Sequence, residues 1–462
     1  MIIRINYFKR EKEKNIGYRG MIGVLRVKNE NHYSHTLNFT AMKTHPFFYL
    51  LLLVVIATTT STQLFAQTDS ETFHTISGTV RDAGNKRPVA FASVFIPGTH
   101  TGTVANLNGS FTLKVKKNLD ITEFAISHLG YRVSKFSISD HQGKSGEFFL
   151  NPHSIMLQEV LVRPLDPREL VEGALNRVKE NYPEEPYRLT GFYREAIKQR
   201  RDYISISEAI IDVYQSSYTS RISSDRVKII RGRKSGDVKD VDTLILKLQG
   251  GPTVAMLLDI MKNPGILISR EMIDFYNYEF LDIVKIDEKN HYVVGFEPAV
   301  ILPFPLFFGK FYISADDLAI AVVEFSMDLS DKKKATRNFI QRKPFNLRFS
   351  ANNTSYMVSY KKIDGKYHLN YLRGELEFFA DWRRRIFRTR YNVMFEMAIT
   401  ERTTENVERF SARESFSRRN ILSDMVPVYF EDGFWGEYNY IEPEESIESA
   451  IEKLNRRIEG SK

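Results

Sequence analysis

Residues 88–111 read PVAFASVFIPGTHTGTVANLNGSF, and this stretch decides the fold of the first part of the chain. Apolar side chains at Ala92, Val94 and Ile96 alternate with the positions between them, which is the period of a β-strand. Glycine-containing turns at Gly98 and Gly109 end the short runs on either side. The same rhythm of short strands and turns continues in both directions, so the sequence predicts an antiparallel β-sandwich.

Several separated motifs in this region resemble the carboxypeptidase-regulatory-like, or transthyretin-like, domain. The resemblance implies a transthyretin-like sandwich over residues 74–162 that acts as a structural or interaction module in exported proteins, without catalysis of its own. The motifs that carry it are Ile76-Ser77-Gly78-Thr79-Val80, Pro88-Val89-Ala90-Phe91-Ala92-Ser93-Val94, Pro97-Gly98-Thr99, Gly102-Thr103, Asn108-Gly109-Ser110-Phe111, Gly130-Tyr131 and Leu157-Gln158-Glu159-Val160-Leu161-Val162.

The segment before the sandwich has the three parts of an export signal. Lys43 precedes an apolar run from Phe47 to Ala57, and Ala66 suits the position before a cleavage site. The run is about half as long as the roughly 20 apolar residues that a membrane-spanning helix needs. We therefore expect a cleaved signal peptide at 42–66, and a preceding extension at 1–41 that is untranslated or disordered.

The formal charge of +8 is concentrated in that extension. Residues 1–41 hold eight basic and three acidic side chains, and 56 basic against 54 acidic side chains remain from Gln67 onward. Nucleic-acid binding needs a concentrated basic face, so we expect no nucleic-acid partner. The chain has no cysteine, which excludes disulfides, thiolate catalysis and a lipid anchor after the signal.

The catalytic signatures of common hydrolases are missing. A metallocarboxypeptidase zinc site typically places Glu three residues after a His, and none of the mature histidines has a carboxylate there. A Gly-x-Ser-x-Gly elbow and a complete phosphate loop are also absent from the sequence. We expect a protein that is not an enzyme and has no cofactor or metal. The mature histidines are His74, His100, His128, His141, His153, His291 and His368.

The pattern of the second half predicts long β-strands. Residues 163–186 form a linker and a helix, in which Asp166 caps and Pro167 takes the first helical position. Alternating aromatic and β-branched runs between 187 and 441 predict a large curved antiparallel sheet or half-barrel with few helices, so the chain is mainly β. Residues 442–462 have the apolar spacing of an amphipathic helix.

Two resemblances concern this half. The segment from Gly309 to Ile320 resembles a hairpin common in lipoprotein-carrier-like sheets. Gly191-Phe192-Tyr193-Arg194-Glu195 and Phe434-Trp435-Gly436-Glu437-Tyr438 together resemble envelope proteins that join a regulatory-like domain to such a region. Larger members of that family continue into an outer-membrane barrel, which implies an outer-membrane-associated transport or assembly component as an alternative function.

Two segments are candidates for ligand contact. Residues 300–308 are the most apolar mature stretch, and they form either a buried core strand with proline edges or the lip of a groove for an acyl chain or a partner's strand. The arginines after Trp382 either contact an anionic group such as a lipid phosphate or form a hairpin tip. The candidate side chains are Phe304, Leu306, Phe307 and Phe308 for the apolar surface, and Trp382, Arg383, Arg384 and Arg385 for the anionic contact.

These observations favour a non-enzymatic, exported binding or scaffold protein of the Gram-negative cell envelope. It is expected in the periplasm or on the periplasmic face of the outer membrane, peripherally associated, with an envelope protein or a lipid-like molecule as its partner. The remaining alternative is an enzyme with a carboxylate site built from Glu195, Glu208 and Glu297. A strongly raised carboxyl pKa inside a cleft would favour the enzyme, whereas an apolar groove without convergent polar groups would favour the binding protein.

Overall fold

The computed structural model describes residues 2–7, 73–118, 121–153, 166–220, 225–235, 244–342, 347–383, 388–428 and 433–444. The expected signal peptide at 42–66 lies outside the described residues, as does the expected C-terminal helix beyond position 444. The described part of the N-terminal extension forms strand β1 (Ile2–Tyr7). The untranslated origin of the extension stays a prediction.

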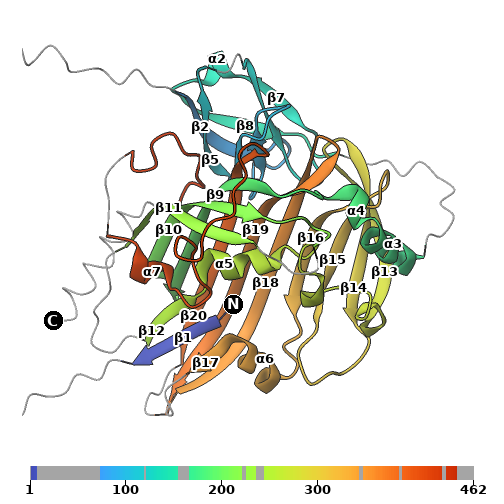
Figure 1. Ribbon diagram of the computed structural model, residues 1–462, viewed down its shortest axis with the longest axis vertical. Helices are drawn as coiled ribbons and strands as arrows, with labels where there is room; N and C mark the ends of the chain where they lie inside the picture. Colours follow the sequence, from blue (N-terminus) through green and yellow to red (C-terminus); the bar gives the residue numbers. More distant parts are fainter. Residues whose placement is uncertain are drawn as a thin grey trace, which may run out of the picture. The chain divides into compact units, whose positions relative to one another are not determined.

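The first module is a two-sheet sandwich, as the sequence predicts (Figure 1). Along β2 every second side chain is buried, and Ile76, Val80, Phe111, Phe124 and Phe148 fill the space between the sheets. One sheet has the order β5-β2-β8 and the other the order β4-β3-β6-β7. The elements are β2 (Phe73–Asp82), β3 (Ser93–Phe95), β4 (Gly102–Val104), β5 (Ser110–Lys116), β6 (Glu123–Ser127), β7 (Ser134–Ser137), α2 (Ile138–His141) and β8 (Ser145–Leu150).

One strand pair departs from the prediction of a wholly antiparallel sandwich. Strands β2 and β8 run parallel, with Gly78 opposite Gly146. A Cβ on Gly78 would lie 2.3 Å from the carbonyl oxygen of Gly146, so only glycine permits this approach. The other strand pairs of the sandwich are antiparallel.

The predicted linker helix is confirmed. Helix α3 (Pro167–Asn176) begins after Asp166, whose carboxylate accepts a hydrogen bond from the backbone N–H of Arg168, and α4 (Val178–Asn181) follows it. Leu170, Val171 and Ala174 on α3 are buried in the core of the second module.

Ten strands form one antiparallel sheet, as predicted for the second half. Its order is β11-β10-β9-β20-β19-β18-β16-β15-β14-β13, so the first strand of the module pairs with the last one, and β11 and β13 are open edges. The strands are β9 (Tyr187–Gln199), β10 (Asp202–Gln215), β11 (Arg226–Lys234), β13 (Tyr276–Ile286), β14 (Lys289–Pro298), β15 (Phe307–Ser314), β16 (Ile320–Met327), β18 (Leu347–Ile363), β19 (Lys366–Trp382) and β20 (Thr389–Thr403).

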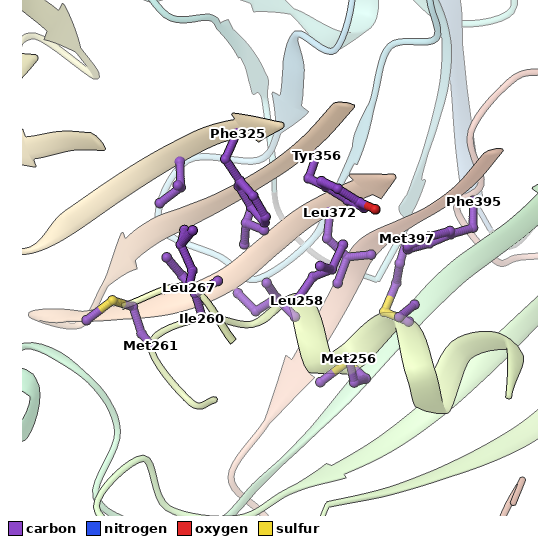
Figure 2. Packing of buried hydrophobic residues seen from close by; sticks show 14 of the residues in the cluster. Met256, Leu258, Ile260, Met261, Leu267, Phe325, Tyr356, Leu372, Phe395 and Met397 are labelled. Atoms are coloured by element: carbon purple, nitrogen blue, oxygen red, sulfur yellow. The ribbon is translucent and has the colours of Figure 1, made fainter. Parts of the chain in front are cut away.

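A helical segment, residues 251–268, covers one face of this sheet, and we call it the cap (Figure 2). Its apolar side chains Met256, Leu258, Ile260 and Leu267 belong to the same buried cluster as Phe325 and Leu372 of the sheet. The cap contains α5 (Gly251–Ala255), η2 (Met256–Leu258) and η3 (Pro264–Ile266). The other short helices of this module are η4 (Ile273–Phe275), α6 (Lys332–Phe339) and α7 (Leu422–Met425). Strands β12 (Leu244–Gln249) and β17 (Ile340–Arg342) pair with β1 in a separate three-stranded sheet.

The apolar stretch 300–308 is not a buried core strand, so that interpretation is wrong. The chain has no regular hydrogen-bonded structure from Val300 to Leu306, and β15 begins only at Phe307. Pro303 and Pro305 explain the difference, because each lacks the N–H that a strand ladder requires.

Candidate functional site

A row of charged side chains crosses the sheet on one face. Cross-strand pairing aligns one residue from each of the ten strands, and the charges alternate along much of the row. From edge to edge the row is Glu279, Gly295, Lys310, Glu324, Met357, Arg373, Glu396, Arg194, Glu208 and Arg233. Opposite charges on neighbouring strands stabilise the pairing.

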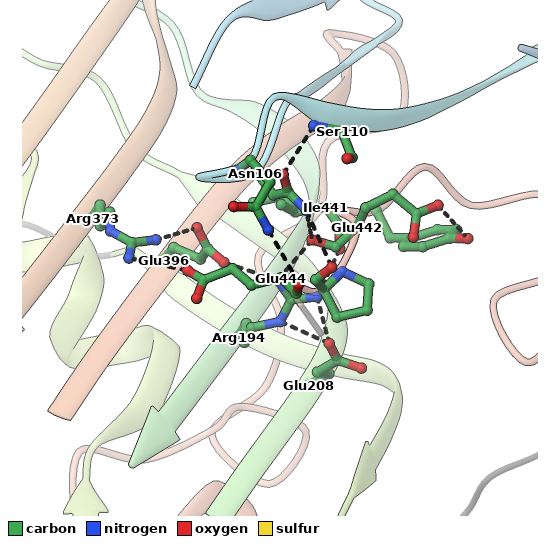
Figure 3. A network of polar contacts seen from close by, with 12 residues as sticks. Asn106, Ser110, Arg194, Glu208, Arg373, Glu396, Ile441, Glu442 and Glu444 are labelled. Carbon is green, nitrogen blue, oxygen red and sulfur yellow. Dashed lines mark hydrogen bonds and ion pairs between the residues drawn. The ribbon is translucent and has the colours of Figure 1, made fainter. Parts of the chain in front are cut away.

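The centre of the row is a buried ion-pair network around Arg194 (Figure 3). The guanidinium of Arg194 lies 2.6 Å from a carboxylate oxygen of Glu208 and 3.0 Å from one of Glu396. Arg373 contacts Glu396 at 2.9 Å, and Arg233 contacts Glu208 at 2.8 Å. Burial alone lowers the pKa of Arg194, but the two carboxylates outweigh this effect, and its pKa lies above the ordinary value.

The described C-terminal residues, 433–444, lie over this network, and we call them the strap. Arg194 donates hydrogen bonds to the carbonyl oxygens of Ile441 at 2.7 Å and Glu442 at 3.3 Å. The indole of Trp435 meets the ring of Phe192 edge to face, with centroids 5.5 Å apart. The two motifs that the sequence analysis linked by resemblance, at 191–195 and 434–438, are therefore in direct contact.

The strap also holds the sandwich. The hydroxyl of Thr103 donates to the carbonyl of Tyr440 at 2.8 Å, and the side-chain amide of Asn106 donates to the carbonyls of Glu442 and Pro443, both at 3.1 Å. Phe91 of the sandwich stacks on Tyr371 of the sheet. The network is thus a structural clamp between the two modules, and its carboxylates are occupied by arginines.

On the same face a cleft of about 1200 Å³ continues from the clamp toward β13. The sandwich contributes Phe91, Leu107, His128 and Leu129 to its walls, and six strands of the sheet contribute the rest. Burial lowers the pKa of His128, so this side chain is neutral at neutral pH. Apolar, acidic and basic side chains all line the cleft.

The opposite face of the sheet holds an apolar cavity of about 190 Å³ beneath the cap. Nine of its ten lining residues are wholly apolar, and Tyr356 is the tenth. Leu258, Phe325, Tyr356 and Phe395 are labelled in Figure 2. The lining residues come from the cap, from three strands near the middle of the sheet, from α6 and from β20: Val254, Leu257, Leu258, Ile266, Phe307, Phe325, Met327, Phe339, Tyr356 and Phe395.

Two buried charged side chains of the cap bind the sheet module, Asp259 and Lys262, and Lys262 donates hydrogen bonds to the carbonyl oxygens of Ser216 and Ser217. Asp259 accepts hydrogen bonds of 2.8 Å from the side-chain amide of Gln215 and from the hydroxyls of Tyr218 and Tyr360. Burial raises the pKa of Asp259 to about 6, although the three donors oppose this effect. We call this group the Asp259 latch.

The three carboxylates of the enzyme alternative do not converge. Glu195 and Glu208 point to opposite faces of the sheet, because Glu195 is paired with Ser207 and side chains alternate along a strand. Glu208 is bound by Arg194 and Arg233, and Glu297 is exposed in the cleft. Burial raises the pKa of Glu195 to about 8, but this side chain lines neither the cleft nor the apolar cavity.

The predicted apolar surface is divided among three hollows. Phe307 lines the apolar cavity, Phe308 lines the charged cleft, and Phe304 and Leu306 line a third hollow beside α6. Phe304 and Phe308 are about half exposed, at 48% and 47%, whereas Leu306 is buried. The four residues therefore line different hollows, and their contact with a ligand or partner stays a prediction.

The predicted anionic contact is only partly described. Trp382 is the last residue of β19, and Arg383 follows it at the surface. Arg384 and Arg385 lie outside the described residues. A contact of these side chains with an anionic group stays a prediction.

Sequence reasoning missed the clamp and the Asp259 latch.

Within the described residues, no group of three or more His, Asp or Glu side chains is arranged to hold a metal ion. None of the described helices has both the length and the apolarity to cross a bilayer.

Comparison with known proteins identifies the sandwich. Residues 76–162 match the family described as the CarboxypepD_reg-like domain, which confirms the resemblance drawn from the motifs. No curated protein matches the chain.

Three solved structures share low similarity with about half of the chain. A LolA superfamily protein from Nitrosomonas europaea is 9% identical, covers 51% of this chain and 94% of its own, and has a TM-score of 0.19. A DUF1329 family protein from Desulfovibrio piger is 12% identical, with coverages of 51% and 94% and a TM-score of 0.24. A putative outer membrane lipoprotein-sorting protein domain from Vibrio parahaemolyticus is 11% identical, with coverages of 52% and 93% and a TM-score of 0.23. At these scores the similarity carries no argument about function, and the matched family covers the sandwich alone.

Proposed function

We propose that this chain is a non-enzymatic binding protein of the cell envelope whose large sheet and cap hold an apolar chain, such as the acyl chain of a lipid. The observation that carries the proposal is the cavity of about 190 Å³ lined almost entirely by apolar side chains. Apolar side chains that line a hollow without being covered by other side chains are typical of sites that bind apolar ligands.

The size and lining of the cavity fit an apolar guest. An apolar cavity of about 150 Å³ stays dry and binds small apolar molecules, because water finds no hydrogen-bond partners there. Each methylene group that leaves water for such a site contributes about 0.8 kcal/mol. A chain of a few carbons fits the cavity as it stands.

A longer chain requires the cap to move outward. The cap is made of short helical turns, which have few internal hydrogen bonds, and its polar attachments to the sheet module include the Asp259 latch and the hydrogen bonds that Lys262 donates to Ser216 and Ser217. Binding pockets for larger ligands measure about 300–1,000 Å³, so displacement of the cap would bring the cavity into that range.

The sandwich serves as the module that contacts other envelope proteins. Its attachment through the clamp and the strap keeps it in one position relative to the sheet, which suits a scaffold rather than a tethered domain. The export signal read from residues 42–66 supports action outside the cytoplasm.

Lipid extraction from the full-length protein, exported and purified without detergent, tests the proposal. We expect an apolar ligand that is retained in Phe304→Ser and Phe308→Ser but lost in Phe307→Ser, since only Phe307 lines the cavity. Circular dichroism checks that each variant is folded. A ligand-free wild-type protein, or equal loss in all three folded variants, would overturn the proposal.

A further inference from the structure

The cleft on the clamp side of the sheet has no role in the binding of an apolar chain, because it opens on the opposite face. Its volume of about 1200 Å³ exceeds the roughly 300–1,000 Å³ typical of small-molecule pockets. Its floor crosses β13, β14, β15, β16, β18 and β19. Five interstrand spacings of about 4.8 Å span about 24 Å, which is the length of about seven residues of extended chain.

The charge of the cleft selects for a cation. Five carboxylates and two cationic side chains line it, which gives a net charge of −3 with His128 neutral. Arg373 is already held by Glu375 and Glu396, so it offers little to an acidic ligand. Glu279 and Glu297 are exposed and form no ion pair with any residue that the structure describes. The carboxylates are Glu279, Glu297, Glu324, Asp328 and Glu375, and the cations are Lys310 and Arg373.

Exposed apolar side chains lie among these charges. Leu107 of the sandwich, Leu281 of β13 and Phe308 of β15 are 48%, 42% and 47% exposed, and all three line the cleft. Large apolar side chains that converge on one hollow from different elements are typical of interaction sites. A simple inorganic cation would leave them in water.

We propose that this cleft binds an extended polypeptide segment of a partner protein in which basic side chains alternate with apolar ones. The basic side chains pair with Glu279 and Glu297 near the β13 edge. The apolar side chains point to the opposite side, toward Leu107 of the sandwich, and the aliphatic parts of the basic side chains cover Leu281 and Phe308 of the sheet.

Fluorescence polarisation with the full-length protein tests this directly. The probes are labelled seven-residue peptides that alternate Lys with Val, and Glu with Val. We expect the Lys peptide to bind and the Glu peptide not to bind. The double variant Glu279→Gln/Glu297→Gln should weaken Lys-peptide binding by about tenfold at low salt. The matched control Glu405→Gln/Glu408→Gln removes two exposed carboxylates elsewhere and should leave binding unchanged.

A third variant, Phe308→Ser, separates the two parts of the proposal. This variant should bind the Lys peptide more weakly than the wild type does. In a competition experiment, spermine, a cation without apolar side chains, should fail to displace the Lys peptide at equal charge. The proposal is overturned by equal binding of the Lys and Glu peptides, by unchanged binding in Glu279→Gln/Glu297→Gln, or by spermine that displaces the peptide as well as unlabelled peptide does.

Discussion

Arg194 is the residue on which the clamp depends. Its guanidinium reaches two carboxylates and two strap carbonyls while it is almost completely buried. A buried ion pair contributes little net stability compared with an apolar replacement, but removal of one partner leaves charges buried without compensation. The main effect of losing Arg194 would therefore be the buried carboxylates left without a partner, rather than the lost attraction itself.

Truncation of Arg194 should be costly. We expect Arg194→Ala to lower the free energy of unfolding by about 3–5 kcal/mol, because Glu208 and Glu396 would stay buried with fewer partners. The control is Arg168→Ala, whose partner Glu172 is 41% exposed, and its cost should stay below about 1 kcal/mol. Urea denaturation measures both values, and similar losses in the two variants would contradict the account.

Glu195 gives a pH dependence whose sign follows from its raised pKa. The folded-state pKa of about 8 exceeds the ordinary 4.5, so between these values the folded protein keeps a proton that the unfolded chain releases. This group's contribution to stability therefore falls as pH rises through that window, by about 1.4 kcal/mol per pH unit. Glu195→Gln removes the dependence.

The measurement compares the free energies of unfolding of Glu195→Gln and wild type across the window from the ordinary pKa to about 8. The free energy of unfolding of the variant should rise steadily relative to that of the wild type as pH rises. The contributions of all other groups cancel in this difference. A difference that stays constant with pH would show that Glu195 is ionised in the folded protein.

At the scale of elements, the cap is the part of the sheet module with the weakest internal structure. Its turns are held by apolar contacts and by the Asp259 latch rather than by long helical hydrogen-bond ladders. Loops and caps that admit ligands are drawn from such low-stability segments.

Loss of the latch should loosen the cap alone. Asp259→Ala leaves the donors of Gln215, Tyr218 and Tyr360 unpaired, so amide hydrogen exchange in residues 251–268 should accelerate while β18 and β19 stay protected. Tyr360→Phe removes the hydrogen bond to Asp259 and the one that the hydroxyl accepts from the backbone N–H of Met261, but it keeps the carboxylate, so the effect should be smaller, about 1–2 kcal/mol. Uniform acceleration throughout the sheet would contradict a local latch.

Most elements of the fold could be predicted from the sequence because their patterns are local. Alternation identified the long strands, Asp166 and Pro167 marked α3, and the turn glycines marked the sandwich. The register between distant strands could not be predicted, since β9 pairs with β20 about 200 positions later. The clamp, the cleft and the apolar cavity all depend on that register, so Asp259 and Glu279 gave no recognisable signal, and Arg194 stood out only as part of the motif at 191–195.

At the scale of the whole molecule, the strap joins the sandwich to the sheet together with direct contacts such as Phe91 on Tyr371 and Arg402 with His100. Trp435 packs against Phe192 of the sheet, while Thr103 and Asn106 of the sandwich bind the neighbouring strap carbonyls. We expect Trp435→Ala to cost about 3–5 kcal/mol and to split thermal unfolding into two transitions, one for each module. A single transition in calorimetry of this variant would show that the modules are coupled by other contacts.

The central claim is that the covered face of the sheet binds an apolar chain, and titration with the fluorescent fatty acid cis-parinaric acid tests it most directly. Met327→Trp fills the cavity, whereas Met425→Trp makes the same change at an exposed site on α7. We expect saturable binding to the wild type and to Met425→Trp, and binding at least about tenfold weaker in folded Met327→Trp. Equal binding by all three proteins, or no saturable binding to the wild type, would contradict it.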